Sequence, residues 1–203
     1  MNSIKFDDNE IYPSKIVCIG RNYVAHIEEL NNEVPKQPVI FIKPNSSISN
    51  EIIINKQDSI QFEGEISFLI QSGEIKGVGF GLDLTKREVQ SSLKSKGLPW
   101  ERAKAFDKSA IFSEFVPFFG NICDLRMELY INNCLIQSGG YRLMLHKPNE
   151  ILTEVSSFLS LENGDVIMSG TPKGVGSIAL GDAFIGKIFE NQQLIVEGRW
   201  LVQ

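Results

Sequence analysis

The stretch from Ser59 to Leu69, S-I-Q-F-E-G-E-I-S-F-L, limits the possible folds of this chain more than any other segment. Four of its apolar residues fall on even-numbered positions: Ile60, Phe62, Ile66 and Phe68. This alternation is typical of a β-strand, and it places the carboxylates of Glu63 and Glu65 on one face. Gly64 adds no bulk to the other face, so we expect another backbone to approach closely there.

Two carboxylates side by side on a strand repel each other, and a bound cation would relieve that repulsion. The pair Glu63 and Glu65 therefore suggests a metal site. Charged residues also occupy ordinary strand faces that are exposed to solvent. The E-x-E pattern is compatible with both interpretations, and the other motifs of the chain must decide between them.

The composition is that of a globular protein: 42% of the 203 residues are hydrophobic and 22% are charged. We predict one domain spanning residues 1–203. A net charge of -5, a pI near 5.2 and the lack of a Lys/Arg run argue against a nucleic-acid partner. The polar N-terminus lacks the apolar core of a signal peptide, and no segment approaches the roughly 18 apolar residues of a membrane span. We therefore expect a cytoplasmic protein with no membrane partner.

The three cysteines, Cys18, Cys123 and Cys134, are scattered along the chain and show no C-x-x-C spacing. Their odd number and their spacing indicate neither a zinc site nor a disulfide framework. We expect reduced thiols packed in strands.

Strand patterns outnumber helical patterns, which predicts a mainly β fold. We expect strands or strand pairs at residues 15–19, 39–43, 51–54, 59–69, 126–138, 165–169 and 184–201. Asn132 and Asn133 fit a two-residue hairpin turn. The glycines Gly77, Gly79 and Gly81 lack the spacing of a dinucleotide-binding loop, and they indicate a strand pressed against another backbone.

Two longer helices are expected, besides a short helical segment nearer the N-terminus. The sequence T-K-R-E from Thr85 to Glu88 has the pattern of a capping box, and Gly97 marks the end of that helix. Residues 149–161 carry an apolar stripe at helical spacing, which predicts a helix packed on the core. Asp83 directly precedes the first helix, so it is either an ordinary turn residue or a ligand at the end of a strand.

His26 and Glu29 are three residues apart in a segment of helical character, which places them on one helix face. They could form a general base, in which the imidazole takes a proton and the carboxylate orients it. A surface ion pair is the alternative. The proline-containing loop at residues 31–38 would leave this helix loosely tethered, as lids are.

Two further motifs have ordinary interpretations as well as functional ones. The turn S-G-T-P-K-G-V-G, which contains Thr171, is not a phosphate-binding loop, but its backbone N–H groups could bind a carboxylate. Lys104 and Asp107 have a spacing that suggests a salt bridge.

Five motifs in one order connect these observations: G-R-N-Y-x-x-H-x-x-E, F-E-G-E, G-L-D-L-T-x-R-E-V-Q, K-G-L-P-W-E-x-A-K-x-F-D and G-D-V-I-M-S-G-T-P-K-G-V-G. Together they resemble the fumarylacetoacetate hydrolase family, in its small single-domain acylpyruvase and oxaloacetate decarboxylase branch. The resemblance extends from about Lys15 to Lys187. It implies a fold of rolled mixed β-sheets with a few peripheral helices, assembled as a homodimer.

The resemblance also implies roles for individual residues. Glu63, Glu65 and Asp83 match ligands for Mg2+ or Mn2+, and hard carboxylate oxygens suit either ion. His26 and Glu29 match a dyad on a lid segment, and Lys104 matches a lysine beside the metal. The remaining matches are to substrate contacts: Arg21, Gln90 and Thr171.

One segment departs from the family pattern. The family usually reads Q-x-G-N-T and then an apolar M-I-F, whereas this chain reads Q-S-G-G-Y-R-L-M-L-H from Gln137 to His146. Gly140 and Tyr141 replace the usual Asn and Thr. We expect the metal site to be unaffected, the loop geometry and the choice of substrate to be open to change, and His146 to lie at the surface.

The function implied is divalent-metal-dependent cleavage of a C–C bond in a 2-oxo acid, by acylpyruvate hydrolysis or oxaloacetate decarboxylation. The metal would stabilise the enolate that leaves when the bond breaks. His26 with Glu29 would activate the water needed for hydrolysis, whereas decarboxylation needs no attacking water.

Three alternatives remain. Within the family, the enzyme could be an isomerase or decarboxylase of an unsaturated dioic acid from aromatic catabolism. The carboxylates could instead hold a structural ion, but a structural site has no use for a base such as His26. A two-metal phosphodiesterase could also use these carboxylates, although the acidic charge balance disfavours a nucleic-acid substrate.

Overall fold

The computed structural model describes residues 1–54 and 59–203, and strands dominate this part of the chain. The strands are β1 Ile4–Phe6, β2 Asn9–Ile11, β3 Lys15–Gly20, β4 Val39–Pro44, β5 Ile48–Ser49, β6 Ile60–Phe62, β7 Gly64–Gln71, β8 Glu74–Asp83, β9 Thr85–Lys86, β10 Ala110–Phe112, β11 Val116–Pro117, β12 Leu125–Ile131, β13 Cys134–Gly140, β14 Val166–Met168, β15 Gly176–Ser177, β16 Ala183–Glu190 and β17 Gln193–Leu201. The helices are α1 Val24–Glu29, α2 Arg87–Ser95, α3 Glu101–Lys104 and α4 Pro148–Ser156, with short 3-10 turns η1 Asn45–Ser47, η2 Ile122–Asp124 and η3 Tyr141–Leu143.

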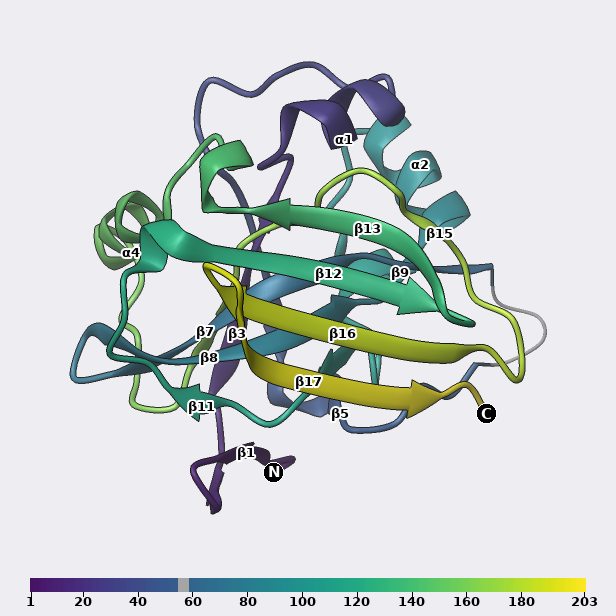
Figure 1. The fold of residues 1–203 in the computed structure, drawn as a ribbon. Coiled ribbons are helices and arrows are strands. Elements are labelled where there is room, and N and C mark those ends of the chain that lie inside the picture. The colour runs from purple at the N-terminus through teal and green to yellow at the C-terminus, as the bar shows by residue number, and fades with distance from the viewer. Residues whose placement is uncertain (55–58) are drawn as a thin grey trace.

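The largest sheet has the strand order β4-β3-β14-β7-β8-β10-β5, with β11 also paired to β8. Its pairs are antiparallel except that β14 runs parallel to β3 and β10 runs parallel to β5. A four-stranded antiparallel sheet, β13-β12-β16-β17, lies across β7 and β8, and α1 and α2 lie together at one end of the molecule (Figure 1). The prediction of curled mixed sheets with a few peripheral helices is therefore confirmed.

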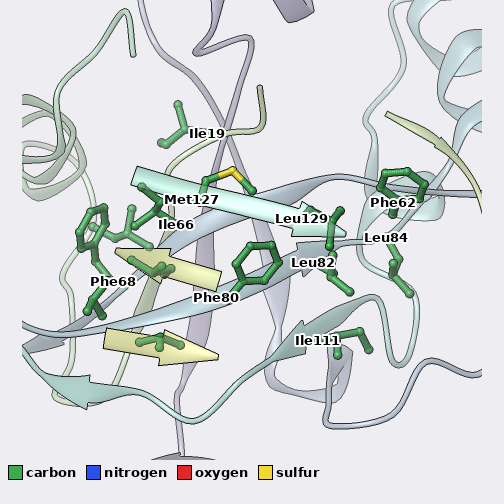
Figure 2. Close-up of a cluster of buried hydrophobic side chains, with 14 of the residues drawn as sticks. Ile19, Phe62, Ile66, Phe68, Phe80, Leu82, Leu84, Ile111, Met127 and Leu129 are labelled. Atoms are coloured by element: carbon green, nitrogen blue, oxygen red, sulfur yellow. The ribbon is translucent and has the colours of Figure 1, made fainter. Parts of the chain in front are cut away.

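Strands β7 and β8 are buried on both faces because a core cluster covers each face. On one face, Phe80 packs against the four-stranded sheet so closely that a Cβ added at Gly186 would lie 2.4 Å from its ring. Figure 2 shows this cluster, in which side chains of β7 and β8 meet Met127 and Leu129 of β12. The opposite face is covered by a second cluster: Ile4, Ile16, Cys18, Ile48, Leu69, Ala110, Phe112, Phe115, Val166 and Met168.

The sequence had suggested that the β8 glycines make room for a neighbouring backbone. They make room for side chains instead. A Cβ at Gly79 would lie 2.8 Å from the Phe115 ring, and one at Gly77 would lie 2.7 Å from the ring of Phe6. The absence of side chains at Gly77 and Gly79 thus allows the rings of Phe6 and Phe115 to pack closely against β8.

The predicted hairpin turn at Asn132 and Asn133 is confirmed, with φ of 50° and 66° as a type I′ turn requires. The predicted capping box is wrong. Helix α2 begins at Arg87 with no side-chain cap, and Thr85 belongs to β9, where its hydroxyl accepts a hydrogen bond from Lys104 instead.

Other local predictions were met in part. Helix α4 is shorter than the predicted span, but Ile151 and Val155 of its apolar stripe are buried as expected. In the predicted strand at residues 51–54, Ile52 forms only an isolated bridge with Val202. All three cysteines are free thiols; Cys18 is buried in β3, whereas Cys123 and Cys134 are exposed. No helix of the described residues has both the length and the apolar character needed to cross a bilayer.

Candidate metal centre

The β7–β8 hairpin brings three carboxylates together. Asp83 N donates a hydrogen bond to Glu63 O at 2.9 Å, which places the last residue of β8 opposite the residue before β7. Glu65 lies one step further along the same face, paired with Gly81. One ligand oxygen from each of Glu63, Glu65 and Asp83 lies within 4.8 Å of the others, and all three residues are buried.

A β-bulge in this hairpin decides which way Asp83 faces. Near the turn, Ile70 pairs with Ile75, but the next pair is Leu69 with Gly77, so Lys76 is an extra residue. Directly opposed residues of an antiparallel pair project to the same face, and a shift of one residue moves a side chain to the other face. Without the bulge, Asp83 would lie opposite Phe62 and would point away from Glu63 and Glu65.

The expectation of one continuous strand through Glu63 is wrong. The strand is interrupted at this residue, because β6 pairs with β9 and β15 whereas β7 pairs with β8 and β14. Glu63 therefore sits at the junction of two sheets. Its carboxylate still converges with that of Glu65, as the E-x-E spacing predicted.

Cationic side chains surround the three carboxylates. Lys104 Nζ donates to Glu63 Oε2 and Asp83 Oδ2, each at 2.8 Å. The predicted partner of Lys104, Asp107, is exposed and has no ion pair with it among the described residues. Segments distant in sequence therefore supply the charge compensation for this site.

Two of these cations, Lys43 and Arg87, were not predicted from the sequence. Lys43 is fully buried, and its Nζ lies 2.9 Å from Asp83 Oδ1. The guanidinium of Arg87 contacts Glu63 Oε1 and also donates to Gln90 Oε1 at 2.7 Å. For Lys43, the available signal was a lysine at the end of the apolar run V-I-F-I-K. For Arg87, it was the spacing of three residues from Gln90, which places both on one helix face.

The pKa shifts show which carboxylate lacks a counter-charge. Burial and the nearby carboxylates of Asp83 and Glu63 raise the pKa of Glu65 well above its usual range. The pKa of Glu63 is lowered despite its burial, because Lys104 and Arg87 are close. Burial opposes the charge on Lys104, but Asp83 and Glu63 outweigh it and raise the lysine pKa. A hard divalent cation would stabilise the ionised Glu65, and this donor set of buried carboxylates fits one.

Helix α1 carries the predicted dyad. His26 is buried, and its Nδ1 lies 3.2 Å from Glu29 Oε2. The same carboxylate accepts from Gly174 N at 3.0 Å and 3.2 Å. The expectation that the S-G-T-P-K-G-V-G turn can bind a carboxylate is confirmed, and Gly170 N of this turn likewise donates to Glu65 Oε2 at 2.7 Å.

A cavity of about 30 Å³ is lined by His26 of the dyad and by Glu63 of the carboxylate cluster. Arg21, Gln90 and Thr171 line it together with His26, Glu63 and Lys104. The structure thus brings the predicted substrate contacts to the predicted site. The cavity has room for roughly one water molecule, so a larger ligand would require the surrounding segments to move. The lid prediction for the α1 segment is compatible with this, and it stays a prediction.

Gln137 is a further residue that sequence reasoning did not assign. Gly64 N donates to Gln137 Oε1 at 2.9 Å, and Gln137 Nε2 donates to Thr171 Oγ1 at 2.9 Å. The open face of Gly64 therefore receives this side-chain amide and not the backbone that we expected. The signal for Gln137 was present in the Q-x-G motif.

The segment that departs from the family pattern lies outside the cavity lining. It still contacts the residue after Arg21: Asn22 Oδ1 accepts from His146 N at 2.7 Å, and Asn22 Nδ2 donates to His146 O at 3.0 Å. His146 was expected to lie at the surface, but it is half-buried. The loop acts on the site indirectly, by holding the chain between Arg21 and α1.

Comparison with known proteins agrees with this architecture. The family model described as fumarylacetoacetate (FAA) hydrolase C-terminal matches residues 15–199. The chain is 38% identical to the oxaloacetate tautomerase FMP41 of Saccharomyces cerevisiae, with 90% of each protein covered. It is 40% identical to the oxaloacetate tautomerase YcgM of Escherichia coli, over 84% of this chain and 87% of the relative.

A solved structure has the same fold. Fumarylpyruvate hydrolase from Pseudomonas aeruginosa, in complex with Mn2+ and pyruvate, superposes with a TM-score of 0.89 at 25% identity. The match covers 99% of this chain and 95% of that one. The matched model, the two relatives and this structure establish that the chain belongs to the fumarylacetoacetate hydrolase family.

Proposed function

We propose that this protein catalyses the metal-dependent interconversion of the enol and keto forms of oxaloacetate. The observation that carries the proposal is the buried cluster of Glu63, Glu65 and Asp83 beside a cavity that contains His26. Two relatives at 38% and 40% identity are named oxaloacetate tautomerases, which supports this choice of reaction.

Glu63, Glu65 and Asp83 would hold Mg2+ or Mn2+, and the bound cation would supply positive charge at the keto oxygen of the substrate. The P. aeruginosa neighbour, described with Mn2+ and pyruvate, supports a divalent cation and a 2-oxo acid at this site. Lys104 remains protonated between Glu63 and Asp83, where it fixes the orientation of both carboxylates.

His26 would carry the proton. Its Nδ1–H is directed at Glu29, so Nε2 keeps a lone pair, and among the described residues Nε2 has no hydrogen-bond partner. This atom would take a proton from the substrate carbon beside the keto group and deliver it to the keto oxygen, which gives the enol; in the reverse direction it would move the proton from the enol hydroxyl to that carbon. Arg21, Gln90 and Thr171 would hold the substrate so that this carbon faces the imidazole.

Cleavage of a C–C bond, the reaction expected from the sequence, is the second candidate. It is favoured by the His26–Glu29 contact at 3.2 Å, because the same imidazole could deprotonate water for the hydrolysis of an acylpyruvate. Oxaloacetate decarboxylation would use the same site without an attacking water. Product analysis separates both reactions from isomerisation of an unsaturated dioic acid, which releases no pyruvate.

The test follows the decay of enol-oxaloacetate by ultraviolet absorbance after EDTA treatment and after Mg2+ or Mn2+ is restored. Pyruvate release from oxaloacetate and acetylpyruvate is measured in parallel. We expect metal-dependent acceleration of the enol decay, and we expect Asp83→Asn to lower it by about two orders of magnitude or more because a ligand is lost.

Asp107→Asn is the matched control, because Asp107 is an exposed aspartate in the segment after α3. This variant should keep full activity. Protein that binds the metal but leaves the enol decay unchanged would rule out tautomerisation. Metal-dependent pyruvate release in that same sample would establish the second candidate.

The homodimer, the single domain and the cytoplasmic location also belong to this proposal. The resemblance to the family supports the homodimer, and light scattering of the purified protein would test it. For the location, imaging of the tagged full chain in its own cell would distinguish the cytoplasm from an organelle.

A further inference from the structure

One face of α2 forms a wall of the candidate cavity. Arg87, Gln90 and Lys94 are spaced three and four residues apart, so they project from the same side of the helix, and all three line the cavity. In Figure 1, α2 lies next to α1 at the end of the molecule where the cavity is found. Of these three residues, Lys94 is the one that has no role in the reaction proposed above.

The cations that line the cavity fall into two groups. Arg87 and Lys104 are bound to carboxylates of the metal centre. Arg21 and Lys94 instead donate hydrogen bonds to neutral oxygens in the segment after α1: Arg21 Nη1 to Glu33 O at 3.5 Å, and Lys94 Nζ to Asn32 Oδ1 at 2.6 Å. In the described part of the chain, neither of them has a carboxylate partner.

The local electrostatics favour an incoming anion. Burial lowers the pKa of Lys94, and the positive charges of Arg21 and Arg87 lower it further. Lys94 is half-buried, and its Nζ lies 5.9 Å from the centre of the Trp100 ring, which also lines the cavity. A carboxylate placed between Arg21 and Lys94 would satisfy two partly desolvated cations at once.

The backbone at Arg21 supports a functional constraint at this position. Arg21 has a φ of 57°, in the left-handed region that residues with a side chain rarely adopt. Such strained conformations cluster at ligand sites, where the surrounding structure enforces them. Here the conformation directs the arginine side chain to the cavity.

We propose that Lys94, together with Arg21, receives the second carboxylate of the substrate, so that the site selects dicarboxylic 2-oxo acids over monocarboxylic ones. This inference rests on the proposed function. It assigns Lys94 and Arg21 as the residues that bind the end of the substrate remote from the metal centre. Binding would exchange the contacts of Lys94 with Asn32 and of Arg21 with Glu33 for contacts with the substrate, and so would release the segment after α1.

The test uses two stable ligands that differ by one carboxylate, L-malate and L-lactate. Each is titrated into the Mg2+-loaded protein, with the fluorescence of Trp100 in the cavity wall as the signal. We expect Lys94→Met to weaken malate binding by about ten- to a hundredfold and to change lactate binding by less than about threefold. Lys94→Arg keeps the charge and should retain most of the preference for malate.

Lys96→Met is the matched control, because Lys96 is exposed two residues further along and does not line the cavity. It should leave both ligands unaffected. Equal weakening of malate and lactate by Lys94→Met, or unchanged malate binding, would overturn the inference. If the wild-type protein accelerates the tautomerisation of oxaloacetate while either result is found, only the role of Lys94 fails. Absence of that acceleration in the metal-loaded wild type would refute the proposed function itself.

Discussion

At the level of single residues, Glu29 combines two tasks. Its carboxylate contacts the His26 imidazole and also accepts hydrogen bonds from the backbone of Gly174. The first contact fixes the orientation of the ring, and the second attaches α1 to the turn that follows β14. Glu29 thus links the orientation of the His26 ring to the attachment of α1 to this turn.

Replacement of His26 separates reactions that need a proton acceptor from one that does not. We expect His26→Gln to slow acylpyruvate hydrolysis and oxaloacetate tautomerisation by about 10²- to 10⁴-fold. Oxaloacetate decarboxylation should fall by less than about tenfold, since loss of CO2 removes no proton from carbon. The three rates are measured on the metal-loaded variant, with His146→Gln as the control because His146 lies outside the cavity lining. Equal loss of all three activities would contradict the separate role of His26.

At the level of elements, the end of β13 shows how a departure from the family sequence is accommodated. Gly140 is in extended backbone and lies so close to β12 that an added Cβ would be 2.6 Å from Leu125 O. The usual Asn at this position would therefore collide with backbone in the present arrangement. Gly140 allows the end of β13 to lie close to β12, and η3 follows directly after it.

We expect Gly140→Asn to lower the free energy of unfolding by about 2–3 kcal/mol, because the collision is with backbone and not with a flexible side chain. Urea unfolding of the wild type and the variant measures the difference. Gly97→Asn is the control: its φ is 63°, which Asn tolerates, and nothing lies within 4 Å of the added Cβ. That change should cost about 1 kcal/mol or less. A Gly140→Asn variant as stable as the control would show that β12 can shift at no cost.

At the level of the whole molecule, the sequence predicted what depends on local pattern. The fold class followed from strand periodicity, and the convergence of Glu63 with Glu65 followed from their spacing. The roles of Lys43 and Arg87 could not be predicted, because these cations reach Asp83 and Glu63 only once β4 and α2 have packed beside the hairpin, whereas Lys104 was placed beside the metal through the family resemblance. The assignment of Thr85 to a helix cap failed for the same reason, since a distant lysine takes its hydroxyl.

Asp165 shows how a single buried carboxylate ties together parts of the chain that are far apart in sequence. Its side chain accepts from Ser14 N at 2.9 Å and from Lys15 Nζ at 2.5 Å, and so joins the start of β3 to the turn before β14. Burial alone would raise the pKa of Asp165, but these hydrogen bonds outweigh it and lower the pKa.

Asp165→Asn should lower the free energy of unfolding by about 2–4 kcal/mol near neutral pH, because Lys15 loses its partner. The folded-state pKa is depressed, so the stabilisation is complete above the unfolded-state value of about 3.9 and is lost as the pH falls further toward the folded-state pKa. The gap between wild type and variant should therefore narrow below about pH 4. Urea unfolding between roughly pH 7 and pH 3 measures it, with Asp107→Asn as the exposed control. A gap independent of pH would argue against an ionised Asp165.

The bulge at Lys76 also limits how this hairpin can change in length during evolution. Side chains alternate faces along a strand, so the number of residues between the Ser72–Gly73 turn and the carboxylates obeys a parity condition. One residue gained or lost in a single strand turns Asp83 away from its partners, whereas one gained in each strand preserves the geometry. Length changes near the turn therefore keep the three carboxylates together only as compensated pairs, and the positive φ values of Ser72 and Gly73 restrict substitutions at the tip as well.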